Sequence, residues 1–183
     1  MKKLLILLFI GLITITGCSS IKVSDKSRMD DNERFSLEYN VSKKNSFKYA
    51  RVHDVIDLLN DGTGIVYFAD SDDEKSLYYT DLILDTLNSN ELNEIYYYNP
   101  SNIKENNTKN YKEIVSILRD YLPEDGDSNI YLDLPNLFFV KNGKVIGHTY
   151  IDSKYDMDDL LEDKTKKKLI KELKNVITKF KSA

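Results

Sequence analysis

The side chains best placed to do chemistry are four polar residues that follow a short apolar run. Asp73, Glu74, Lys75 and Ser76 stand a few residues after the apolar segment 64–68, and they open a stretch with helical spacing of apolar residues. Asp73 is the candidate acid or base. It has no apparent partner in the sequence, and the dipole at a helix start favours its anionic form, which makes it a weak general base near neutral pH. Acid–base chemistry through Asp73 is therefore kept as an alternative and not as the leading hypothesis.

Other polar residues could in principle bind a metal or act in catalysis. The carboxylates with a spacing closest to a calcium loop are Asp70, Asp72, Glu74 and Asp81. An EF-hand loop needs Gly at its sixth position and Glu at its twelfth, where this chain has Lys75 and Asp81. The two histidines, His53 and His148, have no apparent nucleophile beside them. Because glycine-rich phosphate loops and zinc-ligand spacings are also lacking, the sequence predicts neither a metal nor a cofactor.

Hydrophobic periodicity predicts strands that alternate with helices. Strands are expected at 34–41, 64–68 and 95–98, and as a hairpin within 134–147; helices are expected at 49–59, from Ser71 to beyond residue 84, at 111–122 and at 157–180. This alternation favours an α/β fold, a central mixed sheet flanked by helices, with the hairpin as an antiparallel pair at one side.

Local signals set some of the expected boundaries. Ser71 and Glu74 have the spacing of a capping box, so the helix after residues 64–68 is expected to begin at Ser71. The Asn-rich segment 99–110 is expected to be a loop. Asn142-Gly143 is the favoured dipeptide for a two-residue hairpin turn, because both residues tolerate positive φ.

Three of these features together resemble the thioredoxin-like superfamily. They are a buried strand that runs directly into a helix, a four-residue motif at the start of that helix, and the segment 134–143, which contains Leu134, Pro135 and Asn136 before an Asn-Gly turn. The resemblance covers about residues 35–180 and is closest to small bacterial surface thioredoxin-like lipoproteins and bacteriocin-transport accessory proteins. It implies a cis peptide bond before Pro135 and a groove, between that loop and the helix start, that offers backbone hydrogen bonds to an extended polypeptide.

The motif itself departs from the family. Where thioredoxin-like proteins carry Cys-x-x-Cys, this chain carries Asp73-Glu74-Lys75-Ser76. In the family the helix N-terminus lowers the pKa of the first cysteine and favours its thiolate. Because thiol–disulfide exchange needs a thiolate, the sequence predicts a protein without this activity and, in general, one that is not an enzyme.

The N-terminus has the features of a targeting segment. Lys2 and Lys3 precede an apolar stretch, residues 4–15, that is too short to span a bilayer as a stable helix. The residues around Cys18 resemble a bacterial lipobox. This resemblance implies a signal peptide at residues 1–17, lipidation of Cys18 and anchoring of the chain to the outer side of a bacterial cell membrane.

Composition constrains the rest of the chain. Residues 18–33 are polar and are expected to tether the lipid to a domain at residues 34–183. Cys18 is the only cysteine, so an intramolecular disulfide is impossible. A net charge of −4 without a clustered basic face disfavours nucleic-acid binding. The one basic run, residues 164–168, is read as a solvated helix face, with weak contact to anionic lipid as the alternative.

The function expected from these features is peptide or protein binding, as an accessory factor in export or a related process. The expected site comprises Asp73 to Ser76 and the groove residues Leu134, Pro135 and Asn136. Two alternatives stay open: a vestigial groove in a protein that works through another surface, and a non-redox enzyme that uses Asp73.

Overall fold

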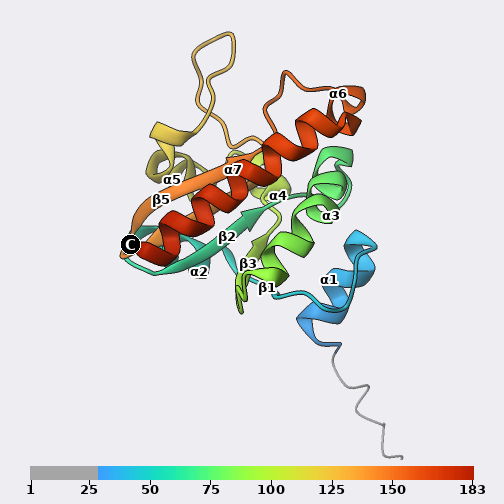
Figure 1. Ribbon diagram of the computed structural model, residues 1–183. Coiled ribbons are helices and arrows are strands. Elements are labelled where there is room, and N and C mark those ends of the chain that lie inside the picture. Colours follow the sequence, from blue (N-terminus) through green and yellow to red (C-terminus); the bar gives the residue numbers. More distant parts are fainter. Residues whose placement is uncertain (1–28) are drawn as a thin grey trace, which may run out of the picture.

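A five-stranded mixed sheet forms the centre of the computed structural model, which describes residues 29–183 (Figure 1). The expected leader 1–17, Cys18 and most of the expected tether 18–33 lie outside the described residues. The strands are β1 Phe47–Tyr49, β2 Gly64–Phe68, β3 Ile95–Tyr98, β4 Asn136–Lys141 and β5 Lys144–Tyr150. Their order is β1-β3-β2-β4-β5. The first three run parallel to one another, β4 is antiparallel to β2, and β5 is antiparallel to β4.

Helices cover both faces of this sheet. They are α1 Asp31–Tyr39, α2 Val52–Asn60, α3 Glu74–Ser89, α4 Ser101–Glu105, α5 Lys109–Ile117, α6 Met157–Leu161 and α7 Asp163–Ser182, with a short 3-10 turn at Arg119–Tyr121. Helices α1, α3, α6 and α7 pack on one face, and α2, α4 and α5 pack on the other. The predicted class, α/β with a central mixed sheet flanked by helices, is therefore confirmed, and the strand order is compatible with a thioredoxin-like fold.

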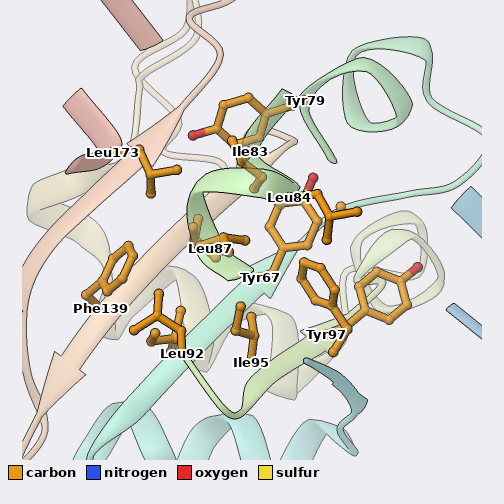
Figure 2. Packing of buried hydrophobic residues seen from close by; sticks show 14 of the residues in the cluster. Tyr67, Tyr79, Ile83, Leu84, Leu87, Leu92, Ile95, Tyr97, Phe139 and Leu173 are labelled. Carbon is orange, nitrogen blue, oxygen red and sulfur yellow. The ribbon is translucent and has the colours of Figure 1, made fainter. Parts of the chain in front are cut away.

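Alternation along β2 and β4 divides the core between the two helical layers. Tyr67 and Phe139 point to the layer of α3 and α7, where they meet Tyr79, Ile83 and Leu173 (Figure 2). Their strand neighbours Val66, Phe68, Phe138 and Val140 point to α2 and α5. Both strands are buried on both faces, as expected for the centre of a three-layer structure. A fully buried side chain of this size contributes about 1.5–3 kcal/mol.

The strand predicted at 34–41 is wrong, because this segment lies in helix α1. Asp30 caps the helix by accepting a hydrogen bond from the Glu33 N–H at 2.9 Å. Phe35 and Tyr39, four residues apart, are 0% and 3% exposed, whereas Leu37 is 65% exposed. The rings of Phe35 and Phe47 stack with centroids 4.0 Å apart. The first strand is instead β1, and the helix begins before the boundary expected at residue 34.

Four further boundaries differ from the prediction. The helix predicted at 49–59 begins at Val52, because Tyr49 belongs to strand β1. Segment 99–110 contains α4, and the helix predicted at 111–122 begins at Lys109 because Thr108 caps it. The single helix predicted at 157–180 is two helices, separated by Glu162 in extended conformation. The Tyr78 hydroxyl donates to the Leu160 carbonyl there and satisfies a group that a continuous helix would pair internally.

The hairpin prediction is confirmed. Asn142 and Gly143 both have positive φ, 51° and 69°, between β4 and β5. The Gly143 N–H donates to the Gly62 carbonyl at 2.8 Å, which joins this turn to the end of α2. In the part of the chain that the structure describes, no helix combines the length and apolar character needed to cross a membrane.

Candidate functional site

Three loops meet at one end of the sheet and bring the predicted site residues together. Phe68, at the end of β2, pairs with Tyr98 of β3 and with Asn136 of β4. The loops next to these three residues therefore lie side by side. We call this site the corner and define it as residues 69–76, 99–101 and 133–135. Carboxyl ends of parallel strands are a common place for binding sites in α/β folds.

Asp73 begins helix α3 but does so as its cap. Its carboxylate accepts a hydrogen bond from the Ser76 N–H at 2.8 Å, and Glu74 is the first helical residue. The predicted capping box of Ser71 and Glu74 is therefore wrong. Asp73 competes successfully because its carboxylate has the right spacing and gains from the helix dipole. The carboxylate that was the candidate acid or base is thus occupied in holding the helix start.

Ser76 is the fully buried residue at the base of the corner. Its hydroxyl accepts a hydrogen bond from the Asp70 N–H at 3.3 Å. Its carbonyl accepts a 2.7 Å bond from Thr80 Oγ1, which also lies 2.9 Å from the Tyr67 hydroxyl. Among the described residues no base lies within hydrogen-bond distance of Ser76 Oγ. Ser76 is therefore placed to stabilise the loop and not to act as a nucleophile.

Asp70 ties the loop after β2 to the loop after β3. Its carboxylate accepts bonds from Asn99 Nδ2 at 3.0 Å, from the Asp72 N–H at 3.0 Å and from the Ser101 hydroxyl. Burial by itself would raise the pKa of Asp70, but the bonds from Ser101, Asp72 and Asn99 outweigh it, and the pKa is lowered. Asp70 is a structural carboxylate that stays ionised.

The loop before β4 contains the expected proline and one carboxylate that was not expected. The Leu134–Pro135 peptide bond is cis, which confirms that expectation. The Leu134 N–H, one of the backbone donors expected to face a polypeptide, donates to Asp133 Oδ1 at 3.0 Å. Burial raises the pKa of Asp133, while the Leu134 N–H and the charges of Lys104 and Lys75 act in the opposite direction.

The other predicted groove residues are less accessible than expected. Pro135 is buried, and Asn136 is 1% exposed. Asn136 Oδ1 lies 3.2 Å from His148 Nδ1. Asn136 Nδ2 has no hydrogen-bond partner among the described residues. Burial lowers the pKa of His148, and its ring stacks on Phe138 and Tyr150. The accessible part of the corner is therefore the helix start and Leu134, not Pro135 or Asn136.

Sequence reasoning found the helix start and the proline loop, considered Asp70 only as a possible calcium ligand, and missed Asn99, Ser101 and Asp133. The signal for Asp70 and Asn99 was present: Asn99 directly follows β3, and Asp70 stands two residues after β2. Asp133 had no such signal, because its role depends on burial beneath neighbouring loops. The corner as a whole is acidic, with Asp72 and Glu74 exposed and Lys75 half-buried.

Within residues 29–183, no three His, Cys, Asp or Glu side chains are arranged to hold a metal ion.

Comparisons with protein-family models, with curated proteins and with solved structures give no match for this chain.

Proposed function

We propose that this chain is a lipid-anchored, extracytoplasmic protein of the thioredoxin-like superfamily that binds a polypeptide at the corner and carries out no thiol–disulfide exchange. The strand order β1-β3-β2-β4-β5, with β2 running into α3 and a closing hairpin, supports the superfamily. The lipid anchor rests on the lipobox-like sequence around Cys18 alone.

The observation that carries the proposal is the position of Asp73 and Ser76. Asp73 occupies the N-terminus of the helix after the central strand, where the family that the sequence resembles has its first cysteine. Ser76, three residues later, is buried. A carboxylate that caps a helix and a buried hydroxyl without a base cannot exchange disulfides or attack a substrate. The corner therefore keeps an architecture suited to binding while its reactive groups are replaced.

Polypeptide binding is physically possible through the backbone of Leu134. Its N–H is satisfied by Asp133 in the free protein. A carbonyl of an extended polypeptide could replace that carboxylate, and Asp133 would then move toward water. Because burial raises the pKa of Asp133, its ionised form is better solvated outside this position. The exchange thus gives up one hydrogen bond, forms another, and relieves a desolvated charge.

A second candidate is binding through another surface. Tyr121 and Tyr150 are 38% and 36% exposed and flank the ring of His148 at the free edge of the sheet. Exposed aromatic side chains are enriched at protein interfaces. This patch would carry the function if the corner proved unused.

Site-specific photo-crosslinking on intact cells tests the corner. Probes replace Asp72 and Lys75, which are accessible, and a matched control probe replaces the exposed Asp57 on α2. The buried Asn136 is unsuitable, because a bulky probe would disturb the core. We expect a discrete adduct at both corner positions and none at Asp57. Equal labelling at all three positions would contradict binding at the corner, and a probe at Tyr150 would then test the aromatic patch.

A further inference from the structure

Helix α7 carries a charge opposite to that of the molecule as a whole. Its residues 163–182 include two acids, Asp163 and Glu172. They also include eight lysines: Lys164, Lys166, Lys167, Lys168, Lys171, Lys174, Lys179 and Lys181. The full chain has a net charge of −4. Positive charge is therefore concentrated on this one helix, which corrects the expectation from the sequence that the chain has no clustered basic face.

The positive charge faces outward on α7. Leu169, Leu173 and Ile177 are buried against the sheet layer. On the opposite side Lys164, Lys167, Lys171 and Lys174 are exposed, and we call these four residues the lysine face. A shallow hollow over this side of the helix is lined by Lys166, Lys167, Ile170, Lys171, Lys174 and Asn175.

The lysine face is not neutralised by the protein itself. The one ion pair that α7 makes among the described residues joins Lys168 to Glu172 at 3.9 Å, and it leaves out all four lysines of this face. Lys167 and Lys171 are four residues apart, and Lys171 and Lys174 are three apart, so like charges adjoin along the helix. Such like-charge pairs repel each other and destabilise a helix. An anionic partner would remove this repulsion.

The position of α7 in the fold favours a membrane as that partner. Helix α1, with which the described chain begins, lies in the same helical layer as α7 (Figure 1). The two helices cover the same face of the sheet from its two edges, α1 beside β1 and α7 beside β4 and β5, so a membrane that contacts the lysine face lies over the face on which α1 also packs. The exposed acids Glu74, Asp81 and Asp85 on neighbouring α3 would restrict the contact to α7 itself.

We propose that the lysine face binds the headgroups of anionic lipids, so that the domain rests on the bilayer along α7. Each lysine close to an anionic membrane surface strengthens binding about five-fold. Only the expected orientation rests on the proposed lipid anchor; the charge pattern stands without it, and the proposal does not depend on polypeptide binding at the corner.

A local fluorescence probe tests this proposal on the full chain. Cys18 is the only cysteine, so Cys18→Ser with Asn175→Cys allows an environment-sensitive dye to be placed beside the lysine face. The matched control carries the dye at Asp57→Cys on α2, across the sheet. Both proteins keep the apolar segment 4–15, so any insertion of that segment affects them equally. Vesicles are phosphatidylcholine alone, or equal parts of phosphatidylcholine and phosphatidylglycerol.

We expect a response from the dye on α7 and none from the dye on α2. The response should require phosphatidylglycerol in the vesicles. It should disappear in about 1 M salt, where the Debye length is about 3 Å. Replacing the four lysines of the lysine face with Gln should weaken binding by about a hundred-fold or more. A control variant should bind as tightly as the unmodified protein. It carries Gln at four exposed lysines outside α7, namely Lys44, Lys109, Lys112 and Lys144. An equal response of both dyes, or equal loss in both variants, would overturn the proposal. A response of the α7 dye to polyglutamate but not to vesicles would assign the face to an acidic polypeptide instead.

Discussion

At the scale of single residues, Asp73 is the side chain whose role changes most between sequence and structure. Its carboxylate accepts the Ser76 N–H and caps α3. We expect Asp73→Ala to lower the free energy of unfolding by about 1 kcal/mol, because a helix N-terminus loses its cap. Urea denaturation measures this. Asp73→Asn should keep most of the stability, and Asp72→Ala, an exposed neighbour, should have little effect. Full stability of Asp73→Ala would contradict the capping role.

Asp133 gives a pH-dependent prediction. Since burial raises its pKa in the folded protein, the folded state holds this proton more tightly than the unfolded state. Asp133 therefore makes stability fall as pH rises from about 3.9, the ordinary value for Asp, through the raised pKa of the folded state. Asp133→Asn should flatten that decline and increase stability near neutral pH. Urea denaturation as a function of pH measures the slope, with the exposed Asp127→Asn as the control. Identical slopes would rule the effect out.

At the scale of elements, the hairpin turn is the most tightly specified connection. A Cβ added to Gly143, whose φ is +69°, would lie 1.9 Å from the Asn60 carbonyl oxygen. Gly143→Ala should therefore destabilise the protein by about 2 kcal/mol or more, through backbone strain and this clash. Thermal or urea unfolding measures it. Gly126→Ala is the matched control, because nothing lies within 4 Å of its added Cβ. Equal stability of the two variants would contradict the packing of this turn.

Sequence patterns predicted the elements that local signals determine. The apolar runs of β2 and β3, the Asn142-Gly143 turn and helix α2 follow from spacing and turn chemistry alone. Helix α1 did not, because Phe35, Leu37 and Tyr39 fit a strand by alternation and a helix by the spacing of Phe35 and Tyr39. Contact with Phe47 and Tyr97 decides for the helix. These are tertiary contacts, so the sequence of the segment by itself does not predict the helix.

The candidate site divides in the same way. Asp73 to Ser76 could be placed at a helix start from sequence, and Pro135 beside it by resemblance. The bond from Ser101 to Asp70 could not be predicted, because it depends on β2 and β3 being neighbours in the sheet. Burial of Asn136 likewise follows from pairing of β4 between two strands. Predicting contacts between loops requires knowledge of the strand order, and the sequence of either loop alone does not provide it.

At the scale of the whole molecule, two surfaces of opposite charge have different proposed partners. The corner is acidic and joins the ends of β2, β3 and the loop before β4, while the lysine face runs along α7. If α7 rests on a membrane, the domain holds the corner in a fixed orientation to the bilayer. A polypeptide that emerges from the membrane would then meet the corner at a defined height, which suits the proposed accessory role.

We propose that the corner has a thioredoxin-like geometry with Asp73 and Ser76 at the positions of the two thiols. Restoring the thiols tests it most directly, with Asp73→Cys and Ser76→Cys combined in a Cys18→Ser background. The Asp73 carboxylate already reaches the backbone N–H of Ser76, with Oδ2 2.8 Å from the nitrogen, so the two residues lie next to each other at the helix start. We predict that the folded variant forms an intramolecular disulfide under mild oxidation and gains some disulfide reductase activity. A folded variant that keeps two free thiols under the same conditions would contradict the account.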